Sequence, residues 1–115
     1  MPQLFDSLSF GPVTVPNRIA VAPMCQYSAN DGAASDWHLA QWTQYALSRA
    51  GYVVLEATGV ERIGRISHGC LGLYSDACEA AMARMLAAAK LSADPQTKWG
   101  VQLAHAGRKG SAQRP

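Results

Sequence analysis

The residues of this chain that could do chemistry lie directly after or within short apolar runs. Cys25 and Tyr27 follow the run at residues 19–22, and Gln102 interrupts the run at residues 99–103. A thiol is polarisable, a phenol donates and accepts hydrogen bonds, and a buried amide needs partners for both its functions. Taken singly, each has a plainer interpretation: an inert buried thiol, a packing ring and a hydrogen bond between strands. Their chemistry therefore depends on the elements that position them.

Short apolar runs bounded by proline, glycine and polar residues indicate buried strands. The first of the longer runs stops at Pro23, which cannot donate to a strand ladder. The predicted strands are residues 8–10 and 13–15, which form a hairpin around Gly11 and Pro12, and residues 19–22, 52–55 and 99–103.

A helix is predicted over residues 37–50, because apolar side chains recur there at intervals of three and four. Ser35 or Asp36 can serve as its N-cap, and Gly51 is expected to end it. The face expected to be buried consists of Leu39, Trp42, Ala46 and Ala50.

A second helix is predicted over about residues 76–92. Asp76 and Glu79 have the spacing of a capping box at its start. Its expected buried face consists of Ala77, Ala81, Met85 and Ala89.

The order of elements is a hairpin followed by strand, helix, strand, helix and strand. This alternation predicts parallel strands with right-handed crossovers, and the long polar loops after the strands are typical of a (β/α)₈ barrel. Such a barrel needs about 250 residues, whereas this chain has 115. We therefore expect residues 1–115 to be the N-terminal part of one barrel domain, with about its first three strands and two helices.

Composition narrows the function classes. Hydrophobic residues make up 49% of the chain and charged residues 16%, as in globular proteins, and the net charge of +2 is too small to indicate nucleic-acid binding. No signal peptide or membrane span is expected, which predicts a cytoplasmic protein without a disulfide framework. His38, His68 and His105 lack zinc-site spacing, so no metal site is predicted. The basic residues after Asp94, the last acidic residue, are Lys98, Arg108, Lys109 and Arg114, and they suit either an anionic ligand or a solvated surface.

Three motifs after the predicted strands occur in the order found in one known family. They are Pro-Met-Cys-Gln-Tyr at residues 23–27, Glu-Ala-Thr at residues 56–58 and Gln-Leu-Ala-His-Ala-Gly-Arg-Lys at residues 102–109. With them the chain resembles the old yellow enzyme family, in its branch of bacterial xenobiotic reductases and thermophilic-like ene-reductases. The resemblance runs essentially from end to end.

The resemblance implies a (β/α)₈ barrel that binds FMN without a covalent bond. NAD(P)H would reduce the flavin, which would pass hydride from N5 to an activated alkene such as an enone, enal, maleimide or nitro compound. Catalytic roles are implied for Tyr27, which would hold the substrate carbonyl, and for Cys25, which would tune the flavin. His105, Arg108 and Lys109 would support the loop. The residues implied to contact FMN are Ala22, Pro23, Met24, Cys25, Ala57 and Gln102.

Several parts of the family pattern fall outside these 115 residues. They are the substrate-binding histidine pair, the proton-donating tyrosine, an arginine beside the flavin and most of the phosphate site. We therefore expect a complementary C-terminal part of the barrel as a partner, and a homo-oligomer once the barrel is complete. The alternative is a non-catalytic truncated barrel that acts in assembly or partner binding. Another phosphate-binding barrel, such as an aldolase, would need a suitably placed lysine, which is lacking.

Overall fold

The computed structural model describes residue 1 and residues 3–110, so Arg114 lies outside the described residues.

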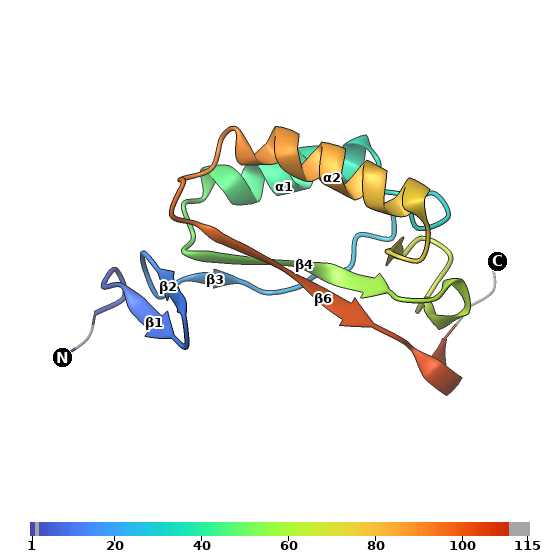
Figure 1. The fold of residues 1–115 in the computed structure, drawn as a ribbon, viewed down its shortest axis with the longest axis horizontal. Coiled ribbons are helices and arrows are strands. Elements are labelled where there is room, and N and C mark those ends of the chain that lie inside the picture. The colour runs from blue at the N-terminus through green and yellow to red at the C-terminus, as the bar shows by residue number, and fades with distance from the viewer. Residues whose placement is uncertain (2, 111–115) are drawn as a thin grey trace.

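The N-terminal hairpin forms as predicted. β1 (Leu8–Phe10) and β2 (Val13–Val15) pair in antiparallel fashion around Gly11, whose φ of +58° suits a residue without a side chain. This hairpin lies at one end of the molecule, before the main sheet begins (Figure 1).

The main sheet is parallel and is built around one long strand. β4 (Tyr52–Gly59) pairs with β3 (Ala20–Val21) at its start, with β5 (Leu71–Gly72) at its end and with β6 (Lys98–Ala104) along most of its length. All of these pairs are parallel, as the alternation of strands and helices predicts. The carboxyl ends of β4 and β6 therefore lie at the same edge of the sheet (Figure 1).

The strand predicted at residues 52–55 is longer in the structure, where it continues for four further residues to Gly59. Glu56 and Thr58 are almost completely buried there, and the Thr58 hydroxyl donates to the Glu56 carbonyl oxygen at 2.8 Å. Polar residues thus remain within the strand because the fold supplies partners for them. The loop predicted to follow is also partly wrong, since it contains the 3₁₀ helix η1 (Arg62–Gly64) and the strand β5.

Helix α1 (Asp36–Leu47) ends earlier than predicted. Ser35 is its N-cap, and Arg49 beyond its end has a φ of 59°, which leaves the helical region. The Asn17 side chain holds this turn, because its amide donates to the Arg49 carbonyl at 3.0 Å and its oxygen accepts from the Gly51 amide at 2.8 Å. The turn after the helix is therefore held by a residue 34 positions away in the sequence.

Helix α2 (Asp76–Lys90) is capped by a residue that the capping-box pattern missed. The Ser75 hydroxyl accepts from the Cys78 amide at 3.2 Å, so Ser75 is the N-cap and the assignment of Asp76 as the cap is wrong. The buried face agrees with the expectation at Met85 and Ala89 and differs at its first two positions. It consists of Cys78, Met82, Met85 and Ala89, whereas Ala77 is exposed.

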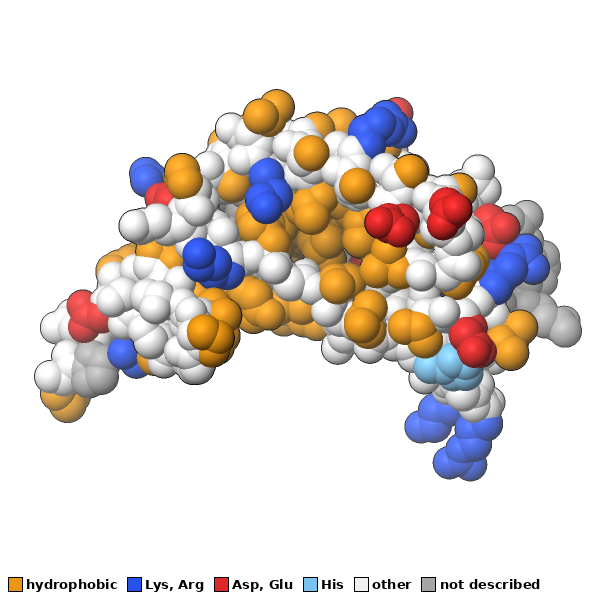
Figure 2. All heavy atoms as spheres, in the orientation of Figure 1, with side chains coloured by type: hydrophobic (Ala, Val, Ile, Leu, Met, Phe, Trp, Pro, Cys, Tyr) orange, Lys and Arg blue, Asp and Glu red, His pale blue; other side chains and the backbone are white. Residues whose placement is uncertain are grey.

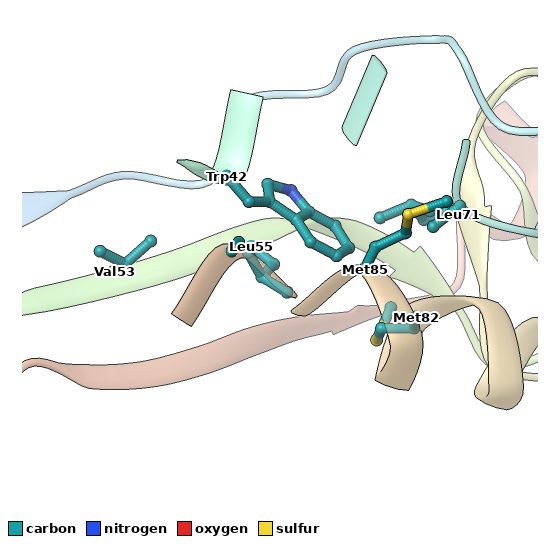
Figure 3. Close-up of a cluster of buried hydrophobic side chains, with 8 residues drawn as sticks. Trp42, Val53, Leu55, Leu71, Met82 and Met85 are labelled. Carbon is teal, nitrogen blue, oxygen red and sulfur yellow. The ribbon is translucent and has the colours of Figure 1, made fainter. Parts of the chain in front are cut away.

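Both helices pack on one face of the sheet and form the core there (Figures 1 and 3). Trp42 of α1 and Met85 of α2 meet Leu55 of β4 in this layer, and all three are at most 2% exposed. Burying side chains of this size stabilises the fold by about 1.5–3 kcal/mol each. Neither helix is long and apolar enough to cross a membrane. The buried cluster consists of Ala34, Trp42, Val53, Leu55, Leu71, Met82, Met85 and Ala89.

An apolar groove separates α2 from the edge strand β6. Figure 2, in the orientation of Figure 1, shows the groove as a hollow in the middle of the visible face of the molecule, with hydrophobic side chains inside it. The indole nitrogen of Trp99 is buried here and has no hydrogen-bond partner among the described residues. The groove is lined by Leu55, Met82, Leu86, Trp99, Gly100 and Val101.

Candidate functional site

The sequence-predicted site residues gather where the parallel strands end. Residues 22–27 follow β3, Ala57 lies near the end of β4 and Gln102 lies near the end of β6. Because neighbouring parallel strands end at one edge of a sheet, three distant segments meet there. This is the edge at which barrel enzymes carry their ligand sites.

Ala57 and Gln102 lie opposite each other at an irregularity in the sheet. Leu55 pairs with Val101 and Thr58 pairs with Leu103, so Glu56 and Ala57 together face Gln102. An extra residue of this kind bends a strand and redirects its side chains, and such irregularities are frequent next to active sites.

Gln102 is exposed, contrary to the expectation of an amide buried in an apolar strand. Its side chain has no hydrogen bond to any residue in the described part of the chain. The plainer interpretation, in which the Gln102 amide forms a hydrogen bond to a neighbouring strand, is therefore wrong. Both functions of the amide are free to meet a ligand.

Cys25 is half-buried beside the site residues of β4. Burial raises the pKa of its thiol, and the neighbouring Cys70 and Glu56 raise it further, while hydrogen bonding with the Ala57 backbone lowers it. The protonated thiol is thus favoured at neutral pH, which suits a polarisable contact better than a nucleophile. Cys25, Cys70 and Cys78 are all free thiols.

Tyr27 projects from the loop after β3 in an unusual backbone conformation. Its side chain is 60% exposed, and its φ of 54° lies in the left-handed region that side chains other than glycine rarely adopt. Residues held in this region are frequent at ligand sites, where the surrounding structure maintains them. The nearby Met24 is 49% exposed, whereas Pro23 is half-buried.

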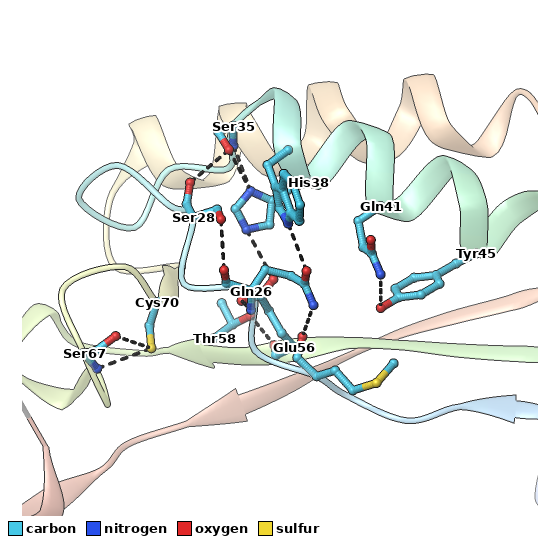
Figure 4. Close-up of polar contacts among 12 residues, drawn as sticks. Gln26, Ser28, Ser35, His38, Gln41, Tyr45, Glu56, Thr58, Ser67 and Cys70 are labelled. Atoms are coloured by element: carbon cyan, nitrogen blue, oxygen red, sulfur yellow. Dashed lines mark hydrogen bonds and ion pairs between the residues drawn. The ribbon is translucent and has the colours of Figure 1, made fainter.

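A buried histidine and a buried glutamate lie next to the loop after β3, and the sequence analysis predicts no role for either. His38 is 0% exposed and Glu56 is 3% exposed, with His38 Nε2 at 3.2 Å from Glu56 Oε1 (Figure 4). The signal that could have found them is the glutamate within the apolar run from residue 52 to residue 59, because a buried carboxylate needs a partner. Trp37, in the first turn of α1, is 56% exposed and donates to Gln26 Oε1 at 2.9 Å.

Charged contacts join the two loops that surround the site. Asp31 of the first loop accepts hydrogen bonds from Arg62 Nε at 2.8 Å, from the Tyr74 hydroxyl at 3.1 Å and from Arg65 Nη1 at 3.3 Å. The Arg62 hydrogen bond lowers the pKa of Asp31, and Tyr74 and Arg65 act in the same direction. The carboxylate therefore stays ionised and holds the loops together at neutral pH.

The loop after β6 lies at the same edge of the sheet as the loops after β3 and β4. Gly107 begins the 3₁₀ helix η2 (Gly107–Lys109) with a φ of +56°, a conformation that a residue without a side chain adopts readily. His105 supports the loop, because its Nδ1 accepts from the Gly107 amide at 3.0 Å and its Nε2 lies 3.3 Å from Glu61 Oε2. Arg108 and Lys109 are exposed in this loop.

The sequence profile of the NADH:flavin oxidoreductase / NADH oxidase family matches residues 3–114. The chain belongs to this family. An NADPH dehydrogenase of Listeria monocytogenes serotype 4a (strain HCC23) is 42% identical over 111 residues, which are 95% of this chain and 32% of the relative. The chain therefore spans about a third of the length of that relative.

Solved structures of old yellow enzymes have the same fold. Morphinone reductase in complex with tetrahydroNAD matches with a TM-score of 0.83 and 27% identity, over 96% of this chain and 29% of the other. The old yellow enzyme homologue from Zymomonas mobilis matches with a TM-score of 0.75 and 30% identity, over 90% of this chain and 28% of the other. These proteins are (β/α)₈ barrels, so the fold predicted from sequence, an N-terminal part of such a barrel, is confirmed.

Membership of the NADH:flavin oxidoreductase family also confirms the expected cofactors at the level of the family, which are FMN and NAD(P)H. The residues present fit a flavin. The free amide of Gln102, the small buried side chain of Ala57 and residues 22–24, of which Ala22 and Met24 are exposed, lie around the strand ends. This donor set can meet the polar edge and the flat face of an isoalloxazine ring.

Proposed function

We propose that this chain supplies the first part of an FMN-dependent ene-reductase that uses NAD(P)H to reduce activated alkenes. Enones, enals, maleimides and nitro compounds are the substrate classes. The observation that carries the proposal is the meeting of residues 22–27, Ala57 and Gln102 at the carboxyl ends of β3, β4 and β6. This edge is where a barrel of the family would hold its cofactor.

The chain's residues divide the work of binding among them. The backbone of Ala22, Pro23 and Met24 would run beside the flavin ring, and Ala57 would leave room for it. The Gln102 amide would donate to and accept from the polar edge of the ring. FMN, when bound, supplies hydride transfer between the nicotinamide and the alkene.

Cys25 and Tyr27 would act on the reaction without forming covalent bonds. The Cys25 thiol, held protonated by its surroundings, would adjust the reduction potential through its polarisable sulfur. The exposed Tyr27 hydroxyl would donate a hydrogen bond to the substrate oxygen, which gains negative charge during the reduction.

The proposal includes a partner that completes the barrel. β6 is an edge strand, and the apolar groove beside it would be covered by the next strand and helix of a barrel. Those elements would come from the remainder of a longer chain or from a second polypeptide. The same uncovered edge supports the alternative function, in which the fragment acts only in assembly or partner binding.

Intact mass spectrometry and a visible absorption spectrum of the protein purified from its source cells would test the proposal. A flavin band, together with polypeptide that carries the remaining strands and NADPH-dependent reduction of 2-cyclohexenone, is the expected result. A colourless protein of 12.3 kDa that reduces no enone would overturn the proposal and favour the assembly function.

A further inference from the structure

The buried pair of His38 and Glu56 is a polar feature that the proposed flavin contacts do not explain. His38 Nε2 and Glu56 Oε1 are 3.2 Å apart, and neither atom has a hydrogen-bond partner elsewhere in the described part of the chain. Isolated buried groups of this kind are costly to desolvate. Each group therefore depends on the other, and the pair needs a reason to be retained.

The start of α1 fixes the orientation of the His38 ring. The Ser35 backbone amide donates to His38 Nδ1 at 3.0 Å. Because a backbone amide can only donate, Nδ1 must be the acceptor, and the proton of the neutral ring lies on Nε2. Nε2–H then lies 3.2 Å from Glu56 Oε1, where its dipole attracts the carboxylate although the contact lacks the geometry of a hydrogen bond.

The second oxygen of Glu56 binds the segment that carries the site. Glu56 Oε2 accepts from the Gln26 backbone amide at 3.0 Å (Figure 4). The Gln26 side chain extends the same contact, since its amide donates to the Met24 carbonyl at 2.9 Å and its oxygen accepts from Trp37 Nε1 at 2.9 Å. Residues 24–26 are thus tied to the first turn of α1 through one carboxylate and one amide.

The strained residue comes next in the chain. Tyr27 has its φ of 54° directly after the Gln26 amide that Glu56 holds. Gly69 closes off the other side, and its carbonyl accepts from the Ala29 amide at 2.9 Å. The unfavourable conformation of Tyr27 is therefore maintained by a polar contact before it and a close backbone contact after it.

We propose that His38 and Glu56 are positioning residues for the segment 24–27. His38 orients the Glu56 carboxylate, the carboxylate holds the Gln26 amide, and the amide fixes the directions of Cys25 and Tyr27. The inference rests on the proposed function, because it assigns these directions to a flavin and a substrate. Without the pair, the segment relaxes and the two side chains leave the strand ends.

Amide hydrogen exchange in the ¹⁵N-labelled chain measures the first part of this inference. His38→Ala should accelerate exchange of the Gln26 amide about tenfold or more, because the carboxylate loses its polar neighbour and with it its orientation. The amides of Val53 and Leu55 should stay protected, which shows that the sheet is intact. Tyr45→Phe is the matched control, since it removes one partly buried polar group from the same helix and should leave Gln26 within about twofold of wild type.

Two further variants separate positioning from simple destabilisation. His38→Gln can still donate to Glu56 and should return the Gln26 exchange rate to within about threefold of wild type. Glu56→Gln keeps the shape but has one oxygen for two donors, so it should accelerate exchange at Gln26. If His38→Ala does not fold, the comparison of Glu56→Gln with Tyr45→Phe decides the question. Equal Gln26 exchange in these two variants overturns the inference.

The flavin-containing protein tests the second part. The dissociation constant for FMN should rise about fivefold or more in His38→Ala and stay within about twofold in Tyr45→Phe, as measured by flavin fluorescence. If wild-type protein binds no FMN, the proposed function fails while the exchange data still test the positioning of the segment. If wild-type protein binds FMN and both variants bind it equally well, the positioning role fails and the proposed function stands.

Discussion

Gly69 lies against the backbone of Tyr27 so closely that an added Cβ would come within 2.5 Å of the Tyr27 carbonyl oxygen and 2.7 Å of its carbonyl carbon. The neighbour is backbone, which cannot rotate away as a side chain can. The loop after β4 therefore shapes the loop after β3, which carries the two candidate catalytic residues, Cys25 and Tyr27. The absence of a side chain at residue 69 is part of the site.

Gly69→Ala should displace Tyr27 and destabilise the chain by about 1–3 kcal/mol, the usual cost of overpacking. Urea unfolding gives the free energy, and the amide resonance of Tyr27 reports the displacement. Gly11→Ala is a useful control, because nothing lies within 4 Å of an added Cβ there and only its φ of +58° is unfavourable. It should leave the Tyr27 resonance in place. An unshifted Tyr27 resonance in Gly69→Ala would contradict the close contact.

Cys25 should be a slow thiol. Since burial is the largest cause of its raised pKa, the pH midpoint of its alkylation by iodoacetamide should lie above the ordinary value of about 8.5. The linked stability effect has a definite sign: the unfolded state ionises first, so the contribution is full below the ordinary pKa and is lost as pH rises through the folded pKa. Peptide mass spectrometry of the alkylated chain gives the midpoint.

A second thiol should account for part of this shift. Cys70 is the next cause after burial, so Cys70→Ala should lower the Cys25 midpoint toward its ordinary value. Cys78→Ala should leave it unchanged, because Cys78 instead contacts Ser75 and the carbonyl of Asp31. A Cys25 midpoint at or below the ordinary value in wild type would mean that the thiol is better solvated than its position indicates.

The sequence predicts the hairpin, the three longer parallel strands and the two helices in their observed order, because these depend on local patterns, but it misses β5 and the 3₁₀ helices. Strand alternation gave the parallel sheet, and the motifs after each strand located the residues that meet at its edge. Predicted boundaries were less accurate. α1 ends at Leu47, well before Gly51, and Asn17 holds the turn between them through contacts that no local pattern reports.

The buried polar pair shows a different limit. Glu56 is the one charged residue in β4, which signals a need for a partner, yet His38 lies in a helix and its pairing depends on how that helix packs. Gln102 is exposed for a related reason: its neighbour Val101 packs against the core under the helices, so the Gln102 side chain points to the opposite face of the sheet, which no described helix covers.

The N-cap of α2 can be tested directly, since sequence and structure disagree about it. Ser75→Ala should cost about 1 kcal/mol, because the Cys78 amide loses its acceptor. Asp76→Ala should cost less, about 0.3–1 kcal/mol, because it removes only a favourable charge near the helix start. Thermal and urea unfolding of the two variants compare them. A larger loss in Asp76→Ala would return the cap to Asp76, as the capping-box spacing suggested.

Gln102 offers the clearest separation of binding from folding. Its side chain is exposed and makes no hydrogen bond to the described residues, so Gln102→Leu should change the free energy of unfolding by no more than about 0.5 kcal/mol. In the flavin-containing protein, the same change removes the amide proposed to bind the polar edge of the ring, so it should weaken FMN binding about tenfold or more, which corresponds to about 1.4 kcal/mol.

Val101 on the same strand is the matched control for Gln102. Its side chain packs against the core and lines the apolar groove, so Val101→Ala should destabilise the fold by about 1–3 kcal/mol. It should leave the FMN dissociation constant within about twofold, because it faces the helices and not the strand ends. The two substitutions are thus expected to have different effects: Gln102→Leu weakens FMN binding, whereas Val101→Ala lowers the stability of the fold. If Gln102→Leu weakens folding and spares FMN, the amide serves the sheet and the flavin edge must be bound elsewhere in the barrel.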